Sequence, residues 1–254
     1  MNAPALSFRP VPGIPEIEPG VDLARVLAES IEKAGLEIVA GDVIAIAQKI
    51  VSKAEDRFVD LRDIVPSARA LALEYSKEKD PRLAELILRE SKRIVRDTPT
   101  VLIVEHRSGI ILANAGIDRS NVRGDDHTAL LLPENADASA ATLKQRLDQH
   151  FSSALGVLIT DSVGRPWRMG TTGLAIGCAG LDAMHDMRGD TDRFGRVLQV
   201  AEIAVADSLA GAANLVMGEG DEGVPAALIS GVGAGASGQT ARDILRPVAE
   251  DLFK

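Results

Sequence analysis

The stretch GVLITDSVGRPWRMG at residues 156–170 joins an apolar run to a segment rich in glycine and charge, and both bear on the fold. The apolar part, residues 156–160, predicts a buried strand that ends at Asp161. The residues that follow predict a loop, after which a short apolar run resumes at residues 174–176. Because loops at strand ends often carry binding and catalytic residues, this stretch also indicates a site.

Comparable runs lie on both sides of this stretch. Strands are predicted at residues 43–47 and 226–230, and a β-hairpin at residues 100–106 and 110–114, which Arg107-Ser108-Gly109 joins. Helical periodicity predicts helices at residues 22–34, 66–95, 139–150, 195–217 and 239–253. The second is broken at Asp80-Pro81, the fourth is the longest, and the last is interrupted at Pro247.

This order of elements predicts a mixed α/β (α+β) fold. Strands and helices do not alternate with the regular rhythm of a doubly wound Rossmann fold. A P-loop is excluded because no G-x-x-x-x-G-K-[ST] segment is present. The glycines of residues 231–238 follow a late strand without a complete βαβ unit, so we interpret them as a loop and not as a dinucleotide-binding motif.

Composition limits the function classes. The chain has 254 residues with a formal net charge of -9 and only 3% aromatic residues, which argues against a nucleic-acid-binding protein. Its single cysteine, Cys178, excludes an internal disulfide and a cysteine zinc cluster, and favours the cytoplasm. No eighteen apolar residues run together, so no membrane partner is expected. Any anionic ligand must therefore be bound locally, by a few cations, backbone N–H groups or divalent metal ions.

Four segments carry more polar and small residues than a packed scaffold needs, at residues 48–55, 115–121, 160–168 and 217–223. Their charged and hydroxyl side chains include Asp118, Asp161, Glu219, Ser120, Ser162, Lys53, Arg165 and Arg168. Hard oxygen ligands suit Mg²⁺ or Mn²⁺, and glycines let backbone N–H groups approach phosphate, as phosphoryl transfer requires. Taken singly, each acid is better explained as a turn, a cap or a solvated residue than as a metal ligand. Trp167, between Pro and Arg, is interpreted as fixing a turn.

In their order along the chain, six segments together resemble the coenzyme F420-0:gamma-glutamyl ligase family. They lie at residues 49–57, 114–121, 131–140, 159–170, 175–180 and 215–225. The resemblance spans nearly the whole chain. It implies one unit over residues 1–254 with a distinctive two-lobed α/β fold, whose lobes are intertwined and cannot be separated by sequence, and a homodimer.

The same resemblance implies a GTP-dependent enzyme that joins L-glutamate to the lactyl carboxylate of F420-0 through an acyl phosphate. It implies two divalent cations, Mg²⁺ or Mn²⁺, with K⁺ as a further candidate; one cation would be bound by Asp118 and Asp161, the other by Ser162 and Glu219. Nucleotide contacts would come from Pro12, Gly13, Ile14, Pro15, Gln48, Lys49, Lys53, Asn121, Met217, Gly218, Gly220, Asp221, Glu222, Gly223 and Val224. Lys53 would face phosphate oxygens, and Arg165 is our own hypothesis for a cation that stabilises the transition state.

Three departures from the family pattern bear on this expectation. Asp56 replaces a glycine, residues 135–137 replace an Asp-Pro-Asp segment, and Ser162 replaces a threonine while keeping the hydroxyl. Two alternatives stay open. One is a ligase with the same activation chemistry and a different carboxylate acceptor, and the other is a non-catalytic nucleotide-binding regulator.

Overall fold

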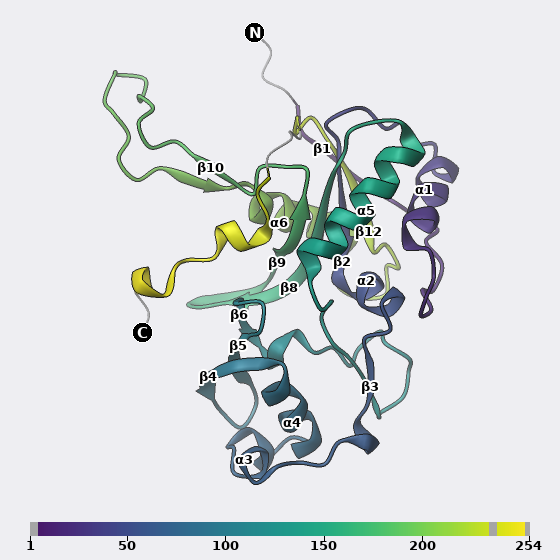
Figure 1. Ribbon diagram of the computed structural model, residues 1–254, viewed down its shortest axis with the longest axis vertical. Coiled ribbons are helices and arrows are strands. Elements are labelled where there is room, and N and C mark those ends of the chain that lie inside the picture. Colours follow the sequence, from purple (N-terminus) through teal and green to yellow (C-terminus); the bar gives the residue numbers. More distant parts are fainter. Residues whose placement is uncertain (1–4, 234–237, 252–254) are drawn as a thin grey trace.

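The computed structural model describes residues 5–233 and 238–251, and it centres on a five-stranded sheet of order β1-β12-β2-β8-β9 (Figure 1). Neighbouring strands are antiparallel except β2 and β8, which are parallel. The strands are β1 (Ser7–Pro10), β12 (Ala226–Ser230), β2 (Val43–Ala47), β8 (Gly156–Arg165) and β9 (Arg168–Ala179).

Helices cover both faces of this sheet. One face carries α1 (Leu23–Lys33), α2 (Gln48–Ala54) and α5 (Ala136–Phe151), and the other carries α6 (Val205–Met217) (Figure 1). Alternate residues of β2 serve the two cores, since side chains along a strand point to opposite faces. Ile44 and Ile46 pack with α1 and α5, whereas Val43 and Ala45 pack with α6. Burial on both faces explains why the strand reads as an unbroken apolar run.

A second group of elements lies beside the sheet and has its own core around Tyr75, Ile87 and Leu102. The helix α4 begins at Pro81 with Asp80 as its cap, as the sequence predicts, because the Asp80 side chain accepts from the Arg82 N–H at 2.9 Å. The group comprises β3 (Phe58–Asp60) paired with β7 (Thr128–Leu130), the sheet β4 (Ser91–Asp97), β5 (Leu102–His106) and β6 (Ile111–Ala113), and α3 (Ala68–Leu71), α4 (Pro81–Arg89), η1 (Leu61–Asp63), η2 (Tyr75–Lys77) and η3 (Asn114–Gly116).

Two segments extend from the sheet region. The strands β10 (Met184–Asp186) and β11 (Glu202–Ala204) form an arm, and the C-terminal segment carries the short turns η4 (Ala241–Ile244) and η5 (Val248–Glu250) (Figure 1). Within the described residues no helix is long and apolar enough to cross a membrane.

Most sequence predictions are confirmed, including the strands at residues 43–47 and 226–230, the hairpin of β5 and β6, and the mixed α/β fold. Of the helical region predicted at residues 66–95, only α3 and α4 are α-helical, because η2 lies between them and residues 91–95 belong to β4 and pair with β5. The helix predicted at residues 195–217 begins only at Val205, since the preceding residues form β11 and the arm. It is also not the longest helix as predicted, because α5 has 16 residues and α6 has 13.

Two further predictions need correction. The loop expected after Asp161 is a β-hairpin, because β8 and β9 continue as paired strands to Arg165 and Arg168. Trp167 adopts a positive φ of 58° and closes the two-residue turn between them, which confirms its interpretation as a turn residue. The helix predicted at residues 239–253 is reduced to η4 and η5, and residues 252–254 of that prediction lie outside the described residues. Residues 234–237 of the glycine-rich segment also lie outside them.

Candidate functional site

A cleft of about 1330 Å³ lies at one edge of the central sheet. Strand β2 ends there at Ala47, beside Thr160 of the parallel strand β8, and the antiparallel strand β12 begins there at Ala226. The segments that follow β2 and precede β12 therefore meet beside the middle of β8. The lining comes from segments within residues 14–18, 47–58, 118–125, 160–171 and 214–225. Ligand pockets typically measure about 300–1,000 Å³, so this cleft has room for more than one ligand.

The structure brings together residues from all four polar segments that the sequence singled out. Among the candidate site residues, those that line the cleft are Ile14, Pro15, Gln48, Lys49, Lys53, Asp118, Asn121, Asp161, Ser162, Met217, Gly218, Glu219, Gly220, Asp221, Glu222, Gly223 and Val224. Pro12 and Gly13 do not line it, although they directly precede residues that do. Arg165 also lies outside the lining, exposed at the end of β8, where it donates to the Met169 carbonyl at 3.5 Å.

Asp118 and Asp161 form the centre of the charged part of the cleft. The Gln48 side-chain amide donates to Asp118 at 2.6 Å, and the Lys49 ammonium lies 3.6 Å from the other Asp118 carboxylate oxygen. Burial raises the pKa of Asp118. Burial, together with the repulsive charge of Asp118, raises the pKa of Asp161 to about 7. The two carboxylates are therefore close enough to repel each other.

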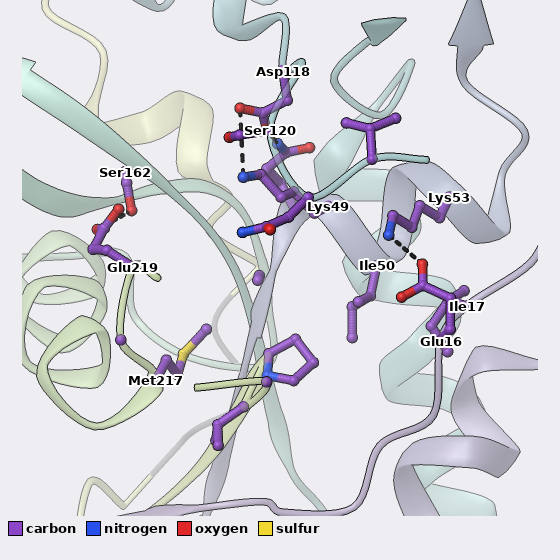
Figure 2. A pocket seen from close by; sticks show the side chains of 18 of the residues that line it. Glu16, Ile17, Lys49, Ile50, Lys53, Asp118, Ser120, Ser162, Met217 and Glu219 are labelled. Carbon is purple, nitrogen blue, oxygen red and sulfur yellow. Dashed lines mark hydrogen bonds and ion pairs between the residues drawn. The ribbon is translucent and has the colours of Figure 1, made fainter. Parts of the chain in front are cut away.

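Ser162 and Glu219 meet across the cleft from β8 and from the segment after α6 (Figure 2). The Ser162 hydroxyl donates to Glu219, and the Asn214 side-chain amide donates to the same carboxylate oxygen at 2.7 Å. Helix α6 ends at Gly218, whose φ of 77° turns the chain so that Glu219 follows directly at the cleft. Asn214 thus fixes the position of Glu219 relative to Ser162.

Lys53 is buried on α2, and its ammonium forms an ion pair with Glu16 (Figure 2). The Glu16 side chain is 68% exposed, whereas that of Lys53 is only 6% exposed. A buried ammonium needs a counter-charge, and here an exposed carboxylate from the segment after β1 supplies it. The partner of Lys53 is therefore a group that a bound anion could replace without disturbing the core.

The donor set fits a divalent cation in its chemistry, although it is not arranged as a finished metal site. Across residues 5–233 and 238–251, no group of three or more His, Cys, Asp or Glu side chains is placed to hold a metal ion. Asp118 and Glu219 instead accept hydrogen bonds from protein groups. Carboxylate and hydroxyl oxygens are nevertheless the ligands that Mg²⁺ and Mn²⁺ prefer. Burial and the charge of Asp118 raise the pKa of Asp161, so a cation bound there would favour its ionised form.

Several cleft residues were not found by sequence reasoning. Asn214 lies on the apolar helix α6, where its polar side chain among Ala, Leu and Val was the available signal. Glu16 directly follows the segment assigned to nucleotide contacts, and nothing in its sequence context marked it. Phe58 and Arg123 also line the cleft and contact each other, with the guanidinium carbon 4.0 Å from the ring centroid. They lie 65 positions apart, so only the fold could bring them together.

Sequence comparison places the chain among known proteins. The model of a family described as F420-0:gamma-glutamyl ligase matches residues 13–231. The chain belongs to this family. A coenzyme F420:L-glutamate ligase of Methanopyrus kandleri is 43% identical over 99% of this chain and 98% of its own length. The protein of that name in Methanothermobacter thermautotrophicus is 42% identical over 98% of this chain and 99% of its own.

A third relative, the coenzyme F420:L-glutamate ligase of Natronomonas pharaonis, is 48% identical over 86% of this chain and 83% of its own length. These matches confirm the family resemblance and identify the protein as an enzyme, an acid–amino-acid ligase. They cover the four polar segments that meet in the cleft, so the cleft is the candidate active site of this F420-0:gamma-glutamyl ligase family member.

Proposed function

We propose that the protein forms an amide bond between the amine of L-glutamate and the carboxylate of F420-0, in F420 biosynthesis, and that the reaction takes place in the cleft. Family membership over nearly the whole chain supports the substrate pair. The observation that supports the location is the meeting of Asp118, Asp161 and Glu219 in the cleft beside the end of β2. An amide bond does not form spontaneously from a carboxylate, so the proposal includes its activation.

The proposed activation uses GTP. A carboxylate oxygen of F420-0 attacks the γ-phosphorus, which gives an acyl phosphate and GDP. The amine of glutamate then attacks the acyl carbon, the C–O bond to phosphate breaks, and the amine loses a proton, leaving the amide and inorganic phosphate. Such a route depends on positioning and charge stabilisation. The cleft can provide both through the ammonium groups of Lys49 and Lys53 and through residues 217–224, here called the glycine-rich loop.

The residues of the chain have separate proposed roles in this route. Lys53 binds phosphate oxygens after the exposed Glu16 carboxylate has been displaced. Backbone N–H groups of residues 217–224 bind the nucleotide, with Asn121 and residues 12–15 beside them. Gln48 and Lys49 orient Asp118.

Two divalent cations, Mg²⁺ or Mn²⁺, are proposed to neutralise the charge of the phosphate groups when bound. Asp118 and Asp161 would hold one, and Ser162 and Glu219 the other. K⁺ remains a further proposed cofactor from the family resemblance. The hypothesis that Arg165 is a cation that stabilises the transition state gains no support from a single chain, because Arg165 does not line the cleft.

We also propose a homodimer and a location in the cytoplasm. The hairpin of β8 and β9 exposes Trp167 and Met169, and the arm exposes Phe194, with exposed fractions of 82%, 98% and 88%. Large apolar side chains gathered on projecting segments are typical of association surfaces. The cytoplasmic assignment is supported by Cys178, a free thiol that a reducing compartment keeps reduced.

The test is mass spectrometry of purified protein incubated with F420-0, L-glutamate, GTP and Mn²⁺. The proposal expects a product heavier by one or more glutamyl units, and no product when the nucleotide is omitted. ATP in place of GTP tests the nucleotide, and Mg²⁺ in place of Mn²⁺ tests the cation. Nucleotide hydrolysis without glutamylation of F420-0 would favour a different carboxylate acceptor, and nucleotide binding without hydrolysis would favour a regulator.

A further inference from the structure

Arg123 and Phe58 form a cation–π pair in the wall of the cleft. The guanidinium carbon of Arg123 lies 4.0 Å from the centroid of the Phe58 ring, well inside the distance of about 6 Å at which a cation is attracted to an aromatic face. Phe58 is fixed by β3, where it pairs with Leu130 of β7. The Phe58 ring therefore supports the guanidinium of the exposed Arg123 side chain.

The pairing of Arg123 differs from that of the two lysines in the same cleft. Lys49 pairs with Asp118, and Lys53 pairs with Glu16. In the part of the chain that the structure describes, Arg123 has no carboxylate partner within ion-pair distance, and its recorded contact is the Phe58 ring. Its N–H groups thus remain available to carboxylate or phosphate oxygens, which a guanidinium can bind through two parallel hydrogen bonds.

The position of Arg123 connects it to the proposed nucleotide end of the cleft. Two residues before it, the Asn121 side-chain amide donates to the Gly220 carbonyl at 3.1 Å. Two extended residues span about 7 Å at most, so the segment runs from the glycine-rich loop to Phe58 over a short distance. A substrate activated beside the glycine-rich loop therefore has the rest of its structure within reach of Arg123.

We propose that Arg123 and Phe58 form the binding subsite for the acceptor, a ligand that combines a planar aromatic ring with an anionic side chain. A guanidinium held over one ring can also contact a second ring and donate hydrogen bonds to an anion. Glutamate has no ring, and the nucleotide is assigned to Lys53 and the glycine-rich loop. The inference rests on the proposed function, in which F420-0, a deazaflavin, is this acceptor.

The experiment compares Arg123→Met, which removes the charge and keeps an apolar side chain over Phe58, with Arg123→Lys, which keeps the charge without the planar group. Arg96→Met is the matched control, because Arg96 is exposed on β4 outside the cleft lining. Two quantities are measured: KM for each substrate at saturation of the others, and Kd for F420-0 without nucleotide, from the change in deazaflavin fluorescence. Equal thermal unfolding midpoints establish that the variants are folded, and Phe58→Leu serves as a second variant if Arg123→Met unfolds.

We expect Arg123→Met to raise both KM and Kd for F420-0 by about 10- to 100-fold, the usual cost of a lost charge-assisted hydrogen bond. KM for GTP and glutamate should change by less than about twofold. The effect of Arg123→Lys should lie between those of Arg123→Met and the unmodified protein, and Arg96→Met should match the unmodified protein. Unchanged acceptor binding in Arg123→Met, or an increase confined to KM for GTP or glutamate, would overturn the subsite. If the unmodified protein binds F420-0 without ligating it, the proposed function fails, and the Kd comparison still decides the subsite.

Discussion

Gly173 of β9 lies directly against the backbone of Ala210 in α6, so closely that a Cβ atom on Gly173 would stand 2.2 Å from the Ala210 carbonyl oxygen. This contact sets the distance between α6 and the sheet. The last turn of α6 carries Asn214 and leads into Glu219, both of which reach the cleft. A glycine on the edge strand β9 thus determines where one wall of the candidate active site lies.

Gly173→Ala is predicted to destabilise the protein by about 3 kcal/mol, because backbone atoms of α6 cannot move aside as a flexible side chain can. For a chain of this size that lowers the unfolding midpoint by about 6–12 °C. Gly164→Ala in β8 is the control, since a Cβ atom there meets nothing within 4 Å. Calorimetry of both variants checks this, and equal midpoints would show that α6 is not held by this contact.

Asp56 adopts a φ of 54°, the left-handed conformation that glycine takes without strain and that the family pattern fills with glycine. Asp56→Gly is predicted to raise the free energy of unfolding by up to about 1 kcal/mol, whereas Asp56→Ala lowers it, because alanine lacks the local hydrogen bonding that lets Asp tolerate this region. Denaturant titration measures both changes. A stabilising alanine substitution would contradict the backbone explanation.

Asp161 links stability to pH in the metal-free protein. Its pKa is raised to about 7 in the folded state, from a usual value near 4, so the folded state binds the proton more tightly. The corresponding stability is present below about pH 4 and is lost as pH rises through 7. Asp161→Asn, which carries no charge, should therefore be more stable than the unmodified protein at pH 8, with a smaller advantage at pH 5. Urea titrations with EDTA at both pH values test this, and an advantage independent of pH would refute it.

Cys178 is predicted to be unreactive in the folded protein. The side chain is buried, with 1% exposure, and burial raises the pKa of its thiol to about 12, so almost no thiolate is present at neutral pH. A thiol reagent such as dithiobisnitrobenzoate should react with one equivalent only after denaturation. Rapid reaction of the native protein would mean that the packing around β9 opens readily.

The sequence predicted those parts of the structure that depend on local patterns. Strand β2 reads as a continuous apolar run because both of its faces are buried, and Asp80-Pro81 signals the start of α4 through capping. The hairpin of β8 and β9 was missed because its outer half is polar, so pairing between the strands, and not apolar periodicity, holds it together.

The residues of the candidate site likewise divide into those that local patterns predicted and those that they did not. Segments rich in glycine, carboxylates and hydroxyls were found because their composition is unusual for a scaffold. Glu16, Phe58 and Arg123 were not, because their interest lies in contacts between distant segments that no local pattern encodes. Likewise, the exposure of Arg165 at the end of β8 follows from the hairpin, which the sequence did not predict.

The measurement that tests the central claim most directly is glutamylation of F420-0 by Asp118→Asn and Asp161→Asn, followed by mass spectrometry with GTP and Mn²⁺. Asp207→Asn is the matched control, because Asp207 is also half-buried with a raised pKa but lies outside the cleft, where it accepts from the Ala175 N–H at 3.0 Å. We predict that both cleft variants lose about a hundredfold or more in turnover while Asp207→Asn retains it. Full turnover in Asp118→Asn and Asp161→Asn would contradict the assignment of the reaction to this carboxylate centre.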